Sequence, residues 1–406
     1  MANSEWRMVA SLILALVFLP AAPAAAADGI TVIENGVRYS FAQQVTFTLQ
    51  ATSDVEITQV YLFFRAMGDD LAQPVDVTLE PAREINVNYM HDLRRSPLPP
   101  FATITFWWQI EDAAGNTLTT EPQQFEYTDN RFHWEKLGAD DLTIHWIEGH
   151  GDLPFGQAAL DIAQASLEEI NAELHAPVPE SIAIYIYDSL HNLKAAMVLA
   201  GREWVAGQAH PELGVIVVSI PFEEEIYTSR MMRCIPHEIT HLLVYQAATP
   251  TGYKHVPEWL DEGLATVNER LPTPEYAMAI EEAYIAGELL PLETLCVPFS
   301  PASQTAFLAY AQSGSVVQFI HEQYGAEGIR ALLEAYANGA SCARGVQETL
   351  NISLSDLETA WLASLNIQEP QAHWQARIEQ IGVWAGLWLL SLLVAVPMIG
   401  GFRHRR

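Results

Sequence analysis

The sequence predicts a multidomain chain with an N-terminal all-β sandwich, an α+β domain and one C-terminal transmembrane helix. Three observations support this fold class. Apolar and polar residues alternate with a period of two over residues 30–130, and from about residue 131 segments with helical spacing alternate with apolar strands. Residues 381–402 contain no charged residue. We therefore expect a signal peptide over 1–27, a sandwich over 28–130, an α+β domain over 131–370 and a linker over 371–380. The predicted helix over 381–402 is followed by a cytoplasmic tail at 403–406.

The first 27 residues have the pattern of a secretory signal peptide. An apolar core over residues 8–19 is followed by small residues up to Ala27, near which we expect cleavage. The only basic residue before this core, Arg7, is offset by Glu5, so an uncleaved N-terminal anchor is the alternative.

The segment from 28 to 130 reads as about seven short strands separated by turns rich in Gly, Pro, Asp and Asn. This spacing resembles sandwiches of the immunoglobulin or fibronectin type. No catalytic constellation is visible here, so a spacer is a simpler interpretation than a domain that grips a polymer. The clearest strands are Val45–Leu49, Ile57–Phe63, Val75–Leu79, Ile85–Tyr89 and Phe101–Ile110.

The segment from 131 to 370 alternates between strands and helices and then becomes mostly helical over 276–365. This order predicts a sheet-containing lobe followed by a helical lobe, with a cleft between them. The predicted elements of the first lobe are strands at 142–146, 181–187 and 214–219 and helices at 157–175 and near 189–200.

The most informative motif is Cys234-Ile-Pro-His237-Glu238-Ile-Thr-His241. On a helix, His237 and His241 lie one turn apart on one face, a spacing that can chelate one metal ion. Glu238 points to the same side and can take a proton from a metal-bound water. The alternative is an ordinary amphipathic helix with two solvated histidines.

A second motif, Pro257-Glu-Trp-Leu-Asp-Glu262-Gly263-Leu-Ala265, supplies the missing ligand type. Glu262 would complete a site of two histidines and one carboxylate, with a fourth position open for water and substrate. Gly263 is expected where the second helix approaches a neighbour closely.

Together, the two motifs resemble those of the gluzincin zinc metallopeptidases, and in particular the peptidase MA-like proteins. The resemblance covers roughly residues 131–370, although only the two motifs are specific. It implies an α+β zincin-like metallopeptidase domain that acts on peptides or proteins. It also implies that His237, His241 and Glu262 bind Zn²⁺ and that Glu238 is the catalytic base.

Weaker features of the same family can be matched as well. Val205–Ala209, followed by a strand at 214–219, resembles the gluzincin edge strand alongside which substrate lies, although a plain buried strand is the alternative. Tyr310 resembles the downstream tyrosine that stabilises the oxyanion, but could equally be a core residue. Thr266, one turn after Glu262, is a candidate partner of a ligand histidine.

Pro236 interrupts the expected helix immediately before His237, because proline lacks an N–H and clashes with the previous turn. Either the helix begins near Ile235 with Pro236 in its first turn, or it is kinked at Pro236. Both alternatives keep His237 and His241 on one face.

Three cysteines allow at most one disulfide. Cys296 and Cys342 are plausible partners in an oxidising compartment. We interpret Cys234 as a small buried apolar residue, because a fourth protein ligand would close the metal site.

The C-terminal segment predicts membrane attachment. The uncharged residues 381–402 are long enough to cross a bilayer, and the arginines of 403–406 would stay on the cytoplasmic side. We therefore expect a single-pass cell-membrane protein with its catalytic domain outside the cytoplasm.

The chain is strongly acidic, with a formal net charge of −30. This charge argues against nucleic-acid binding and against adhesion to anionic lipid beyond the predicted anchor. A second functional hypothesis is a catalytically inactive, zinc-containing binding or adhesion module displayed on the cell surface.

Overall fold

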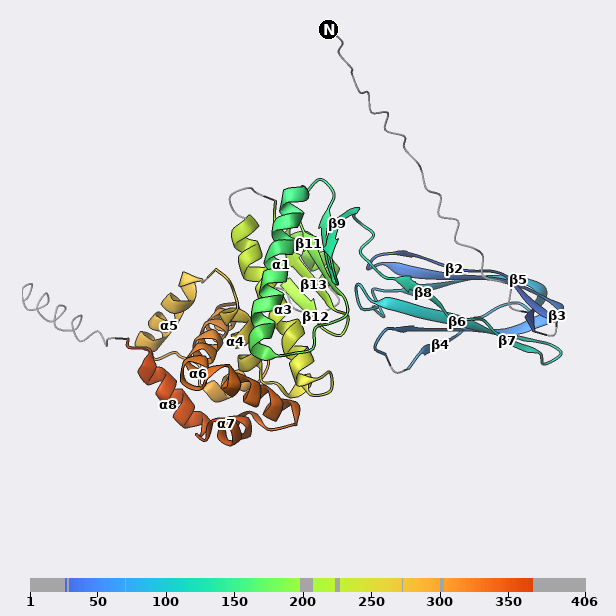
Figure 1. The fold of residues 1–406 in the computed structure, drawn as a ribbon. Helices are drawn as coiled ribbons and strands as arrows, with labels where there is room; N and C mark the ends of the chain where they lie inside the picture. The colour runs from blue at the N-terminus through green and yellow to red at the C-terminus, as the bar shows by residue number, and fades with distance from the viewer. Residues whose placement is uncertain are drawn as a thin grey trace, which may run out of the picture. The chain divides into compact units, whose positions relative to one another are not determined.

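The computed structural model describes residues 29–367, except for 70, 198–206, 223–226, 272 and 300–302, together with a two-residue strand at Ala26–Ala27. The chain divides into two compact units between Arg131 and Phe132 (Figure 1). Apart from Ala26–Ala27, the predicted signal peptide lies outside the described residues.

The first unit is a sandwich-like antiparallel β-structure whose strands are all connected through one hydrogen-bonded network. The order is β1-β2-β3-β6-β7, with β4 and β5 also paired to β3, and β8 paired to β6. The strands are β1 (Ala26–Ala27), β2 (Ile30–Ser40), β3 (Gln44–Ala66), β4 (Gln73–Asp76), β5 (Ala82–Asp92), β6 (Thr103–Asp112), β7 (Thr117–Thr119) and β8 (Gln123–Glu126).

The long strand β3 joins the two layers of this unit. Its first half pairs with β2 and β5, its second half pairs with β4 and β6, and the register shifts between Thr52 and Ile57. Phe47 from the first half stacks on Phe64 from the second, with ring centroids 5.3 Å apart. The two strands predicted at 45–49 and 57–63 are therefore one strand, because its shift in register bends the chain without a turn.

The second unit begins with a mixed five-stranded sheet in the order β12-β13-β11-β10-β9. The three inner strands run parallel, while β9 and β12 form antiparallel edges. Every residue of β13 is buried, as expected for an apolar strand inside a parallel sheet. The strands are β9 (Trp134–Ala139), β10 (Leu142–Ile147), β11 (Ile182–Tyr187), β12 (Gly207–His210) and β13 (Val215–Ser219).

Helices make up the rest of this unit, and the predicted change to a helical lobe is confirmed. Helix α6 is interrupted at Gly325, whose φ of 65° is not helical. The helices are α1 (Leu153–Leu174), α2 (Leu190–Met197), α3 (Tyr227–Ala248), α4 (Glu258–Val267), α5 (Pro274–Ala286), α6 (Ser303–Ala337), α7 (Cys342–Leu350) and α8 (Leu354–Ser364), with 3₁₀ turns η1 (Tyr253–His255) and η2 (Leu292–Cys296).

Pro236 lies inside α3, so the alternative in which the helix begins near Ile235 is wrong. Pro236 has no N–H to donate to the carbonyl of Met232, one turn earlier. That carbonyl instead accepts a hydrogen bond of 2.8 Å from the backbone N–H of Arg270, which follows α4. A tertiary contact therefore replaces the helical bond that proline removes, and His237 and His241 remain on one continuous helix.

The predicted disulfide between Cys296 and Cys342 is present. It joins η2 to the first residue of α7. The indole Nε1 of Trp259, on α4, donates to Cys342 Sγ at 3.3 Å. The disulfide thus contacts the helix that carries Glu262.

The predicted transmembrane helix is the part of the fold class that must be corrected. Among the described residues, no helix is both long and apolar enough to cross a membrane. The longest of them, α6, carries charged residues and is broken at Gly325. The predicted span at 381–402, its linker at 371–380 and the tail at 403–406 lie outside the described residues. The structure therefore does not support the predicted single-pass location in the cell membrane.

The predicted close approach at Gly263 is confirmed, and it generates a test of the fold. A Cβ atom added at Gly263 would lie 2.5 Å from Val317 Cγ2 and 2.6 Å from the Ser313 carbonyl oxygen, both on α6. An exposed helical Gly→Ala change normally stabilises by about 1 kcal/mol. We expect Gly263→Ala instead to destabilise the second unit by about 1–3 kcal/mol, because α4 must move away from α6. Urea denaturation followed by tryptophan fluorescence measures the change, and a stabilised variant would contradict it.

Candidate metal centre

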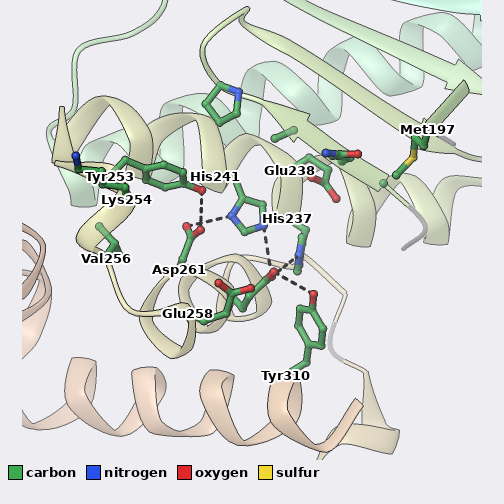
Figure 2. A pocket seen from close by; sticks show the side chains of 15 residues that line it. Met197, His237, Glu238, His241, Tyr253, Lys254, Val256, Glu258, Asp261 and Tyr310 are labelled. Atoms are coloured by element: carbon green, nitrogen blue, oxygen red, sulfur yellow. Dashed lines mark hydrogen bonds and ion pairs between the residues drawn. The ribbon is translucent and has the colours of Figure 1, made fainter. Parts of the chain in front are cut away.

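Helices α3 and α4 bring the predicted ligand residues into one pocket of about 470 Å³. His237 and His241 extend from α3 (Figure 2), and Glu262 on α4 lies next to both of them. Glu262 Oε2 lies 3.4 Å from His237 Nε2 and 3.4 Å from His241 Nε2. One ligand atom from each residue lies within 4.8 Å of the others.

This spacing fits a zinc ion. Ligand atoms about 2.1 Å from a tetrahedral ion lie about 3.4 Å from each other. Glu262 is only 5% exposed, yet its Oε2 atom has no hydrogen-bond partner within the described structure. Buried acceptor atoms normally have a hydrogen-bond partner. A metal cation bound to this oxygen would take the place of the missing partner.

The opposite ring nitrogens of both histidines face carboxylates. His241 Nδ1 lies 3.1 Å from Asp261 Oδ1, and the Tyr253 hydroxyl donates to Asp261 Oδ2 at 2.7 Å. His237 Nδ1 lies 3.5 Å from Glu269 Oε1. These contacts orient each ring so that Nε2 points at Glu262, as is usual for metal-binding histidines.

The supporting residues Asp261, Tyr253 and Glu269 were not predicted from the sequence, which suggested Thr266 instead. That prediction is wrong, because the buried Thr266 hydroxyl has no hydrogen-bond partner in the described structure. Its side chain lies against Gly314 of α6. Asp261 could have been suggested by its position beside Glu262, whereas no local signal points to Tyr253 or Glu269.

The carboxylates set the electrostatics of the histidine pair. Burial lowers the pKa of His237, but the Glu262 and Glu269 carboxylates outweigh this effect and raise it to about 9. Burial also lowers the pKa of His241, but the Asp261 and Glu262 carboxylates outweigh this effect and raise it well above its usual value. Burial raises the pKa of Glu262, but the two imidazoles hold it below its usual range. Glu262 is therefore ionised, and the imidazoles are strong bases.

Glu238 is buried at the same pocket and lies against the edge strand β12. A Cβ atom at Gly207 would be only 2.6 Å from Glu238 Oε1, so any larger residue at this position would displace the carboxylate. Burial raises the pKa of Glu238, while His237 and His241 lower it. Of the predicted edge strand, Gly207–Ala209 lie in β12, whereas residues 205 and 206 are outside the described residues.

Tyr310, on α6, also lines the pocket and is 8% exposed. Its hydroxyl donates a hydrogen bond of 3.0 Å to Glu262 Oε1, the carboxylate oxygen that does not face the histidines. The observed contact is thus with a predicted ligand, and the oxyanion role stays a prediction. Cys234 is outside the ligand group, and burial raises the pKa of its thiol to about 12.

The contact between Asp261 and His241 predicts an effect on metal affinity. We expect Asp261→Asn to weaken zinc binding by about tenfold or more, because the neutral amide no longer orients and polarises the imidazole. Competition with a chromophoric chelator measures the affinity directly. Asp54→Asn, an exposed change on the first unit, is the control. Equal affinities for the two variants would contradict the supporting role of Asp261.

Comparison with known proteins adds a family assignment. No curated protein matches the chain. The M1 zinc metallopeptidase of Deinococcus radiodurans is 15% identical over 82% of this chain and 94% of its own, with a TM-score of 0.40. OgpA from Akkermansia muciniphila is 10% identical over 24% of this chain, with a TM-score of 0.21. The present chain spans only 28% of OgpA. With scores of this size, neither structure bears on function.

The sequence model of the Peptidase MA superfamily matches residues 162–367. This match covers about half of the 406 residues and contains both motifs of the metal centre. The chain therefore belongs to the Peptidase MA superfamily.

Proposed function

We propose that the protein is a zinc-dependent peptidase in which His237, His241 and Glu262 hold the ion and Glu238 is the general base. The observation that carries this proposal is the 3.4 Å spacing of Glu262 Oε2 from both imidazoles, next to a second buried carboxylate in an open pocket. Membership of a peptidase superfamily supports a peptide or protein substrate.

When bound, zinc would lower the pKa of a water molecule and polarise the scissile carbonyl group. Glu238 would remove a proton from the attacking water and later deliver one to the leaving amine. Its burial suits this exchange, because a carboxyl group with a raised pKa holds the proton between the two steps.

The edge strand β12 gives the substrate a place to bind. Within the described part of the chain, β12 pairs with β13 at the edge of the sheet, and we propose that an extended peptide pairs with its other side. Gly207 lets β12 itself pass close to Glu238, so a peptide paired with this strand would lie near the proposed base. We propose that the added strand brings the scissile bond between Glu238 and the metal ligands.

Tyr310 would act as a hydrogen-bond donor to the developing oxyanion. Burial raises the pKa of its hydroxyl, and the nearby Glu262 raises it further, so the proton stays in place. Transfer of this hydrogen bond from Glu262 to the substrate oxygen would stabilise charge that forms only in the transition state.

Two variants test the division of roles. We expect Glu238→Gln to retain zinc but lose at least about a hundredfold in peptide cleavage, because general-base catalysis is removed. We expect His241→Ala to lose both zinc binding and peptide cleavage, because a metal ligand is removed. Metal analysis gives the zinc content of the full-length proteins, and mass spectrometry of a diverse peptide mixture gives the cleavage.

Equal zinc loss in both variants would contradict this assignment. A zinc-loaded wild-type protein that cuts no peptide would instead favour the inactive binding module.

A further inference from the structure

We propose that a second pocket beside the metal centre binds a carboxylate of the substrate. This inference rests on the proposed peptidase function. The second pocket has a volume of about 460 Å³ and shares Lys254, Val256 and Glu258 with the metal pocket. Because these residues line both cavities, a peptide extending from the metal centre across this wall would enter the second pocket.

The two pockets differ in charge. The metal pocket is lined by four carboxylates, including Glu258, and by one lysine. The second pocket is lined by Lys254, Arg344 and His255, and Glu258 is its only carboxylate. The chain has 50 acidic residues but only 20 lysines and arginines, so a pocket lined by Lys254, Arg344 and a single carboxylate contrasts with the acidic chain as a whole. At physiological salt, interactions between exposed charges are screened over about 8 Å. Acidic residues farther away than this therefore oppose the binding of an anion only weakly.

The Lys254, Arg344 and His255 side chains are available to a ligand. Lys254, His255 and Arg344 are exposed, and no ion pair within the described structure engages Lys254 or His255. Arg344 Nε lies 3.6 Å from Glu348 Oε1, but more than half of each side chain is exposed, so this pair contributes little. Arg344 Nη2 also donates to the Gly339 carbonyl at 2.8 Å, which holds the guanidinium at the pocket.

The walls of the second pocket are preformed. The Cys296–Cys342 disulfide lines it, and Cys342 Sγ accepts a hydrogen bond from Trp259, three residues before Glu262. The pocket is thus fixed to the helix that carries the predicted metal ligand, which lowers the ordering cost of binding. Val297, which is 59% exposed, offers apolar surface to the methylene groups of a glutamate side chain.

The occupant that fits this combination is a carboxylate of an extended peptide whose scissile bond lies at the metal centre. An acidic side chain and the C-terminal carboxylate share this chemistry. A peptide series carrying one glutamate at successive positions, with glutamine counterparts and C-terminal amides, separates the two sources.

The first measurement is kcat/KM for each peptide with the zinc-loaded full-length protein. We expect a carboxylate at one position to raise kcat/KM by about fivefold, the size of a partly exposed ion pair, and less at high salt. Arg344→Gln should remove the preference and Arg344→Glu should reverse it. Arg83→Glu, an exposed change on β5 of the first unit, makes the same change in net charge and should preserve the preference.

The second measurement is binding of the same peptides to the zinc-loaded Glu238→Gln protein by fluorescence anisotropy. A carboxylate preference that depends on Arg344, without cleavage by the wild type, would support the subsite and contradict the peptidase. Cleavage without any carboxylate preference, or with a preference unchanged in Arg344→Glu, would overturn the subsite and leave the peptidase intact. Absence of both cleavage and binding would overturn both.

Discussion

Burial of Glu262 beside two imidazoles is the constraint on which the second unit depends. A buried carboxylate is costly unless charged or hydrogen-bonded partners surround it. The partners come from separate parts of the chain: His237 and His241 from α3, and Tyr310 from α6. The close contact at Gly263 lets α4 approach α6 far enough for this to occur. Packing and electrostatics therefore specify the same arrangement of helices.

Helix α4 also connects features that are distant in sequence. It carries Glu262 into the metal centre, Asp261 to His241, and Trp259 to the Cys296–Cys342 disulfide. A disulfide that closes a long loop restricts the unfolded chain and can stabilise by about 2–4 kcal/mol. Here it also supports the helix next to the candidate site. The position of Glu262 is consequently fixed from several sides.

The sequence was most informative where the deciding interactions are local. Helical spacing alone brings His237 and His241 together, and the small Gly263 marks a close contact. Interactions that depend on tertiary structure could not be predicted. Glu269 reaches His237 only through the fold, and the polar run Thr52-Ser53-Asp54, which separates the two predicted strands, lies inside the continuous strand β3. The membrane prediction relied on residues 381–402, which lie outside the described residues. No helix among the described residues is long and apolar enough to cross a membrane.

The hydrogen bond between Met232 and Arg270 has a consequence for how the site assembles. In the nascent chain, the helix around Pro236 would have an unsatisfied carbonyl until the segment after α4 docks. That same segment carries Glu269, which contacts His237. One short segment therefore both replaces the hydrogen bond that Pro236 removes and orients the imidazole, so a chain still lacking this segment would offer a metal ion histidines without that support.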